Sequence, residues 1–146
     1  MRRLVVALAA AAVVALSLTA LSLASTRTTT WTAALTAGQE VPKQAVKVTA
    51  AHGQFKGTLS GSKLKWTLTF AKLSGPAMAA HIHMGGMGKA GNVVVVLCAS
   101  TCKSGKTGTA TISAAVQSAF KKHLLYVNIH TAKNPNGEIR GQLAAG

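Results

Sequence analysis

The sequence predicts an all-β domain, an antiparallel β-sandwich that carries one short helix. Polar and apolar residues alternate through most of the chain after residue 24, which is the pattern of strands with one buried face. The alternating segments are short, and glycine, proline, asparagine or serine turn signals separate them. Seven to nine short strands spaced in this way indicate a β-sandwich, and 146 residues suffice for one domain.

The first 24 residues read as a secretory signal peptide. A positive start (MRR) precedes an uncharged apolar run over residues 4–23, and small residues at the end of the run suit cleavage near Ala24. An uncleaved N-terminal anchor is the alternative, because about 20 apolar residues can span a bilayer. We expect a secreted, extracellular or cell-envelope protein with a single domain over residues 25–146, in contact with a membrane only if the leader is retained.

Four strands are expected in the first half of the domain. Residues 28–35 (TTTWTAAL) are rich in β-formers, and residues 46–50 form a shorter β-prone segment. Residues 53–59 and 63–70 both alternate and are joined by Ser-Gly-Ser, which predicts a hairpin. In the second arm of this hairpin, the side chains expected to face the core are Leu64, Trp66, Leu68 and Phe70.

The second half of the domain adds five strands and the helix. The strands are expected at residues 78–83, 93–97, 106–112, 124–130 and 138–143. The run VVVVL in the second of these is apolar throughout, as in a central strand. Residues 113–122 predict the helix, with Ser113 as N-cap and two lysines in the last turn.

The two cysteines, Cys98 and Cys102, are expected to form a structural disulfide. Their small loop fits the oxidising compartment that a signal peptide implies. A redox pair and a metal-thiolate site are the alternatives. The three-residue spacing differs from the C-x-x-C of redox proteins, and the sequence has no further cysteine to complete a thiolate site.

The domain is strongly basic. The formal charge of +14 falls to +12 once Arg2 and Arg3 leave with the leader, and the only carboxylate side chains are Glu40 and Glu138. Such a surface attracts anionic cell-envelope polymers; an extracellular protein is a second candidate partner. The lysines are scattered and aromatic residues are few, so we expect no nucleic-acid binding.

Polar residues on three late segments predict one functional patch. Alternate residues of a strand share a face, and in each of these segments the residues between the polar ones are apolar. The polar members are His81 and His83 in the first segment, Tyr126, Asn128 and His130 in the second, and Glu138, Arg140 and Gln142 in the third. If the three segments pair in one sheet, these groups gather on a common surface.

Spacing leaves two interpretations of this patch open. His81, His83 and His130 could ligate a metal, because an H-x-H pair with a third histidine suits copper or, with lower preference, zinc. Alternatively, the histidines belong to a hydrogen-bonded network in which Arg140 pairs with Glu138 or with the distant Glu40. The binding or structural residues of that network are Glu40, Tyr126, Asn128, Glu138, Arg140 and Gln142.

Catalysis without a metal has little support. The sequence contains no aspartate, which excludes a paired-aspartate site and a Ser-His-Asp triad. A Cys-His nucleophile would compete with the disulfide. We therefore name no catalytic residue and expect a protein that is not an enzyme.

Three blocks of the sequence resemble the CHRD domain family, which is named from chordin and is also found in secreted bacterial proteins. They are LTAGQEVP (residues 35–42), AAHIHMGGMGKAGNVVVVL (79–97) and YVNIHTAKNPNGEIRGQL (126–143), and the similarity covers about residues 31–143. Lys43 replaces a second proline that the family often has, and a glycine common before the Tyr-Val-Asn is missing here. The resemblance implies an extracellular, immunoglobulin-like β-sandwich, in a family whose general biochemical activity is not established.

The histidine pattern is also similar, more faintly, to the metal strands of copper-zinc superoxide dismutase. By that likeness His81, His83 and His130 would be copper ligands. The sequence lacks a recognisable bridging histidine and the aspartate of the zinc site, which argues against dismutase activity even where copper binds.

Two functions are compatible with these patterns. The first is a secreted, non-enzymatic binding or adhesion module whose ligand the sequence does not identify. The second is a copper-binding envelope protein with a superoxide-dismutase-like site, in which Arg140 steers an anion toward the metal.

Overall fold

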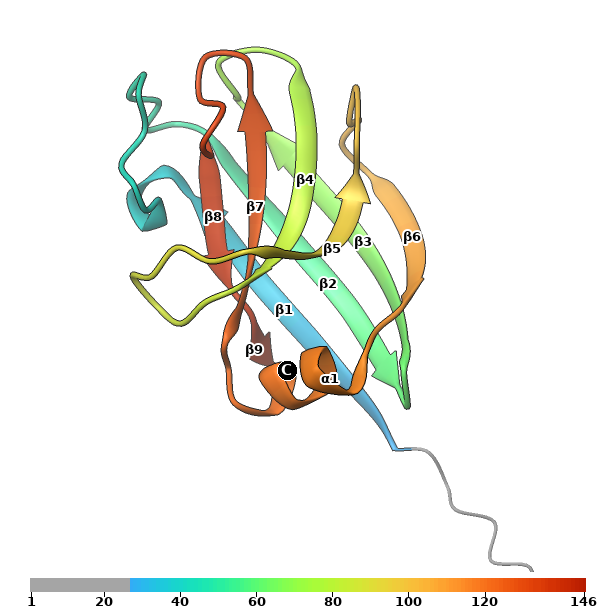
Figure 1. Cartoon of the computed structure of the whole chain (residues 1–146). Coiled ribbons are helices and arrows are strands. Elements are labelled where there is room, and N and C mark those ends of the chain that lie inside the picture. Colours follow the sequence, from blue (N-terminus) through green and yellow to red (C-terminus); the bar gives the residue numbers. More distant parts are fainter. Residues whose placement is uncertain (1–26) are drawn as a thin grey trace, which may run out of the picture.

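The predicted all-β architecture with one short helix is confirmed. The computed structural model describes residues 27–146, so the predicted leader lies outside the described residues. The strands form two layers (Figure 1). The front layer contains β4 (Ala77–Met84), β5 (Val93–Cys98), β7 (Leu125–Thr131) and β8 (Ile139–Gln142). The back layer contains β1 (Thr28–Thr36), β2 (His52–Ser60), β3 (Lys63–Ala71) and β6 (Lys106–Thr111). The short β9 (Ala144–Ala145) lies beside β1.

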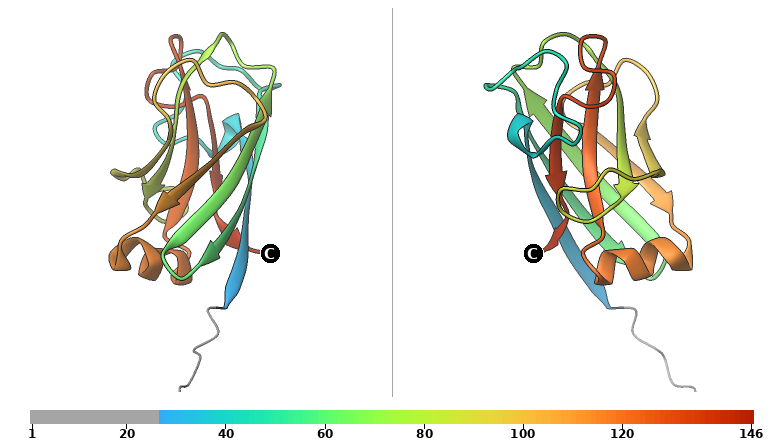
Figure 2. Two further views of the ribbon diagram at one scale, coloured as in Figure 1. Left: turned by 90° about the vertical axis from the view of Figure 1, so that its right-hand side faces the viewer. Right: turned by 60° about the vertical axis from the view of Figure 1, so that its left-hand side comes forward.

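Hydrogen bonding runs through both layers as one antiparallel path, in the order β5-β4-β7-β8-β1-β2-β3-β6. The layers are joined where β8 meets β1, at the pair Thr36 and Arg140. The path ends at β5 in one layer and at β6 in the other. Figure 2 shows the layers from the side, with loops at one end of the sandwich and the helix at the other. The fold is therefore a sandwich that is hydrogen-bonded along one seam.

Apolar side chains fill the space between the layers, as the alternation predicts. Leu64, Trp66 and Leu68 are buried, and Phe70 is half-buried where β3 approaches its end. The helix α1 (Ala114–Lys121) starts as predicted, because the Ser113 hydroxyl accepts a hydrogen bond from the Val116 amide. The helix closes one end of the core.

The prediction of a strand at residues 46–50 is wrong. This segment lies in the loop between the 3-10 turn η1 (Ala37–Gln39) and β2. Side chains take the place of a strand partner: the Val46 amide donates to Asn134 Oδ1, and the Val48 amide donates to Gln44 Oε1. These two amides are thus satisfied without a ladder, one by the distant Asn134 and the other by the nearby Gln44.

The predicted disulfide between Cys98 and Cys102 is present, and no cysteine among residues 27–146 is free. The disulfide links Cys98, at the end of β5, to Cys102, whose amide donates a hydrogen bond to the Ala77 carbonyl on β4. Within the same residues, no helix has the length and apolar character needed to cross a bilayer.

Gly141 permits the close approach of β8 to β1 at the seam. A Cβ placed on this glycine would lie 2.5 Å from the Ala34 carbonyl oxygen and 2.9 Å from its carbonyl carbon. These are backbone atoms, which cannot rotate away as the end of a side chain would. The joint between the layers therefore depends on the absence of a side chain at this position.

We predict that G141A destabilises the fold by about 3 kcal/mol, because the added methyl group forces the layers apart. The matched control is G38A, since a Cβ at Gly38 would have nothing within 4 Å. Urea unfolding followed by tryptophan fluorescence measures both variants. Equal stability of the two variants would show that the seam tolerates the methyl group.

Candidate metal centre

Strand pairing brings the three polar segments together. β7 lies between β4 and β8, with His81 opposite Asn128 and Asn128 opposite Arg140. In the next row His83 lies opposite Tyr126, which lies opposite Gln142. The side chains between these positions, such as Ile82 and Val127, are fully buried in the core. We use the name outer patch for the polar face that results, formed by His81, His83, Tyr126, Asn128, His130, Arg140 and Gln142.

The three histidines of the outer patch converge. One ring nitrogen from each of His81, His83 and His130 lies within 4.8 Å of the other two. His81 Nδ1 and His130 Nε2 lie 3.2 Å apart. Two nitrogens bound to one ion at about 2.0–2.1 Å stand roughly 3.4 Å apart in tetrahedral geometry. The spacing of His81 and His130 therefore matches that of two ligands of one ion, and the third imidazole lies close enough to join them after a small movement.

Two backbone carbonyls orient the rings. His83 Nδ1 is 2.9 Å from the Gly91 carbonyl oxygen, and His130 Nδ1 is 3.0 Å from that of Pro135. A carbonyl only accepts, so each Nδ1 carries the proton and each Nε2 presents its lone pair. His83 Nε2 is buried and has no hydrogen-bond partner. Metal-ligating histidines are held in this way by the nitrogen that does not bind the ion.

His81 completes the donor set through its other nitrogen. Because His130 Nε2 is an acceptor, the hydrogen bond between the two rings needs a proton on His81 Nδ1. A metal ion would take the place of that proton. The donor atoms would then be Nδ1 of His81 and Nε2 of both His83 and His130.

The surroundings keep the imidazoles neutral, which is the form that binds metals. Burial lowers the pKa of His130 to about 4, with a smaller contribution from the charges of His81 and His83, although the bond to Pro135 opposes the shift. Burial likewise lowers the pKa of His81 and His83 below the usual value; His83 adds to the shift at His81, and Arg140 adds to the shift at His83.

Tyr126 links the histidines to Arg140. Its ring stacks on His83, with 4.9 Å between centroids and 10° between planes, and Arg140 Cζ lies 3.5 Å from the Tyr126 ring centroid. The Tyr126 hydroxyl accepts a hydrogen bond from the Gly91 amide at 3.1 Å. Tyr126 thus positions both the His83 ring and the backbone that holds its Nδ1.

The loop between β4 and β5 crosses in front of the outer patch (Figure 1). Arg140 Nη2 donates to the Gly86 carbonyl at 2.9 Å, and Gln142 Nε2 donates to that of Gly85 at 3.0 Å. The loop covers the charged end of the patch, so Arg140 is only 1% exposed. The two side chains that fasten the loop come from β8.

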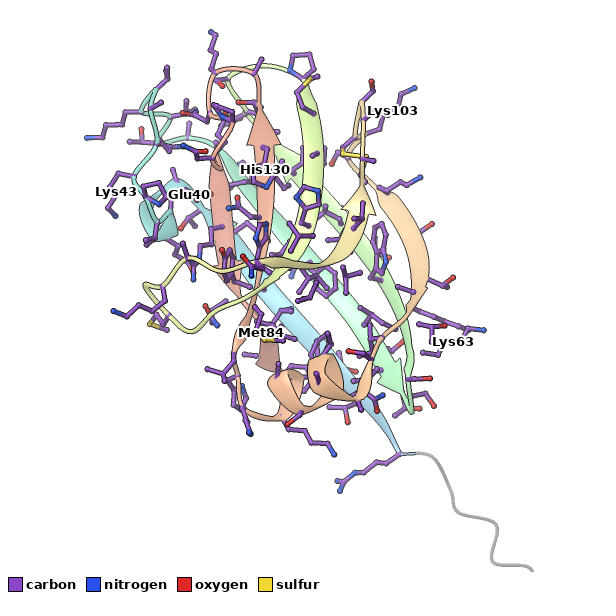
Figure 3. The ribbon with its side chains drawn as sticks, in the orientation of Figure 1. Glu40, Lys43, Lys63, Met84, Lys103 and His130 are labelled. Carbon is purple, nitrogen blue, oxygen red and sulfur yellow. A yellow bond between two sulfur atoms is a disulfide. The ribbon has the colours of Figure 1, made fainter. Side chains whose placement is uncertain are left out.

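Glu40 reaches the same region from the loop after η1. In Figure 3 Glu40 and His130 both lie toward the loop end of the sandwich, while Met84 lies nearer the helix end. The carboxylate is fully buried and accepts a hydrogen bond from Asn128 Nδ2 at 3.4 Å. Burial raises the pKa of Glu40 to about 7, against the attraction of Arg140. Glu40 and Arg140 attract one another without a direct hydrogen bond.

Glu138, one of the two alternative partners predicted for Arg140, does not pair with it; Arg140 donates to Gly86 and Gln142. The Glu138 carboxylate instead accepts hydrogen bonds from Ser74, Thr131 and Asn134, which lie at the loop end of the sandwich. Although burial acts to raise the pKa of Glu138, these bonds together lower it. The Glu138 carboxylate ties the connection between β3 and β4 to the connection between β7 and β8, beside the outer patch, and is not part of that patch.

Residues 91 and 135 were missed by the sequence reasoning because they act through backbone carbonyls. Both lie in turn-rich stretches, GGMGKAG and NPNG, whose glycines and prolines indicate a fixed chain path but give no ligand chemistry. The exposed His52 and His123 lie outside the cluster.

Comparison with known proteins gives one match. The family model described as CHRD domain matches residues 31–143, which include all the residues of the outer patch. No curated protein and no solved structure matches the chain, so the faint likeness to superoxide dismutase has no support from these comparisons. The chain belongs to the CHRD domain family.

Proposed function

We propose that this CHRD-domain protein is an exported, non-enzymatic copper-binding module. The observation that carries the proposal is the convergence of three neutral imidazoles, two of them oriented by backbone carbonyls and one presenting a buried nitrogen without a partner. A hydrogen-bonded network alone would leave that buried nitrogen uncompensated, at a cost of about 1–3 kcal/mol. A metal ion compensates it.

Copper is favoured over the other divalent ions. Imidazole suits both zinc and copper, and the general order of affinities places Cu²⁺ above its neighbours. Three histidines leave at least one coordination position for water or an external ligand. Export is supported by the leader-like residues 1–24 and by the disulfide between Cys98 and Cys102.

The other members of the outer patch support the site. Tyr126 and the Gly91 carbonyl orient His83, and Arg140 and Gln142 fasten the loop that covers one side. We assign no catalytic step to any of these residues. Arg140 is enclosed by the Tyr126 ring and the Gly86 carbonyl, which favours a positioning role over the steering of anions.

We predict that residues 27–146 bind one Cu²⁺ with submicromolar affinity, and that H81A/H83A weakens binding at least about 100-fold. The matched control is H52A/H123A, which removes two exposed histidines outside the cluster. Competition with a chromogenic chelator gives the affinity, and electron paramagnetic resonance counts the nitrogen ligands. Absence of submicromolar binding in the parent protein, or equal losses in both double variants, would refute the proposal.

Y126F should lower copper affinity about tenfold, as expected when a group that orients a ligand is lost. The phenyl ring preserves the stack on His83, but the Gly91 amide loses its acceptor, and the carbonyl that holds His83 becomes free to move. Copper competition and thermal unfolding of the metal-free protein are measured together. A lower melting temperature with unchanged affinity would mean that Tyr126 serves stability alone.

Glu40 should make the stability of the metal-free protein fall as pH rises. Its pKa is about 7 when folded and close to 4.5 when unfolded, so the native state holds an extra proton between these values. The histidines act in the opposite direction, because their folded pKa values are lowered. E40Q removes only the first contribution, so the variant should gain up to about 3 kcal/mol relative to the parent between pH 4.5 and pH 8.

Urea unfolding across this pH range, with a chelator present, tests the effect. E138Q is the control with the opposite sign, because the pKa of Glu138 is lowered in the folded protein. Glu138 therefore stabilises the fold at pH values above its unfolded-state pKa, and this stabilisation is lost as pH falls. A difference between E40Q and the parent that does not change with pH would show that Glu40 titrates normally.

A further inference from the structure

The outward face of the back layer is a regular array of hydroxyl and ammonium groups. Register places one residue of each of the strands β1, β2, β3 and β6 in line, and three such lines follow one another. The lines are Thr28, Ser60, Lys63 and Thr111, then Thr30, Thr58, Lys65 and Thr109, then Thr32, Lys56, Thr67 and Thr107. We call this array the threonine–lysine face. It contains no carboxylate, aromatic or aliphatic side chain.

The charge of this face has no acidic side chain to balance it. Glu40 and Glu138 are the only carboxylate side chains of the protein, and both have an exposed fraction of 0%. Every lysine among residues 27–146 is exposed. In Figure 3 Lys63 projects away from the back layer. An anion that approaches this face therefore meets ammonium groups that are free of competing carboxylate side chains.

The centre of the face is hollowed into a shallow groove of about 500 Å³. Its walls carry the hydroxyl groups and two of the lysines, and Gly57, Gly108 and the largely buried Trp66, which is 6% exposed, complete its lining. The polar lining residues are Lys56, Thr58, Lys65, Thr67, Thr107 and Thr109. The groove crosses β2, β3 and β6, so it is part of the regular array.

We propose that the threonine–lysine face binds an acidic polysaccharide of the polyuronate class. Uronate carboxylates pair with the ammonium groups of Lys56, Lys63 and Lys65, while threonine hydroxyls donate to and accept from sugar hydroxyls. The groups repeat about every 4.8 Å across the strands and about every 7 Å along them, and such a lattice suits a polymer that repeats its own groups. This site is separate from the copper site, which lies on the outward face of the other layer.

The chemistry of the face disfavours two other kinds of anion. Single-stranded nucleic acid is bound through exposed aromatic stacking platforms, and the one aromatic residue that lines the groove, Trp66, is only 6% exposed. Binding to an anionic membrane surface generally uses apolar side chains that enter the bilayer, and these are missing. The threonine hydroxyls and isolated lysines of the face instead match a polysaccharide that carries both hydroxyl and carboxylate groups.

Alginate, a soluble polyuronate, is the probe that tests the proposal, with dextran as its uncharged counterpart. The experiment compares the parent protein with K56Q/K63Q/K65Q on the face and with K43Q/K89Q/K133Q, which removes the same charge elsewhere. We expect the face variant to bind alginate about tenfold more weakly, and the control variant to bind almost as the parent does. Binding should disappear near 1 M salt, because the Debye length there is only about 3 Å and the charges no longer attract one another across the interface.

A second variant separates hydroxyl recognition from simple charge attraction. T67V/T107V keeps every charge and the β-branched shape but removes two groove hydroxyls, and it should weaken alginate binding several-fold. Equal losses in the two lysine variants, no effect of the valine variant, or stronger binding to polyphosphate or phosphatidylserine vesicles than to alginate would each overturn the proposal. All measurements contain a chelator, so failure of the copper proposal would leave this result unchanged.

Discussion

The pairing of β7 with both β4 and β8 is the constraint on which the candidate site depends. The three histidines come from two strands, and their rings meet only because Ala79 lies opposite His130 while His81 lies opposite Asn128. A one-residue slip would send the imidazoles into the core and Ile82 into solvent. The apolar face therefore specifies the geometry of the polar face: residues such as Ile82, Val127 and Ile129 set a register that the histidines share.

A sheet face that carries polar groups and is also covered needs internal partners. The loop between β4 and β5 covers Arg140 and Tyr126, and Glu40, which comes from the loop after η1, is fully buried beside Asn128. Backbone carbonyls supply several of the acceptors, among them those of Gly86 and Gly91. The glycine-rich loop thus has two roles, since it lies close against the sheet and presents its carbonyls to guanidinium and imidazole groups. Order in the site comes from loop backbone as much as from side chains.

The alternation of polar and apolar residues predicted which side chains share a face of a strand, but not which strands lie next to one another. The period of two residues placed His81 with His83 and Tyr126 with Asn128, and the structure keeps those assignments. Which segments pair is a property of the whole chain, so the partner of Glu138 could not be read from its position two residues before Arg140. The same limit explains residues 46–50, where the Val46 amide and carbonyl bond to the side chain of the distant Asn134. The threonine–lysine face needed the register of four strands before its array could be seen.

The burial of both acidic side chains has a consequence for how the surface responds to acidification. Most protein domains have exposed carboxylates that take up protons in mild acid, so the net charge of the surface becomes more positive. Here Glu40 and Glu138, the only carboxylate side chains of the protein, are both fully buried. Acidification therefore neutralises no exposed acidic side chain of this domain. Attachment to a polyanion would then weaken in acid through titration of the polymer rather than of the protein.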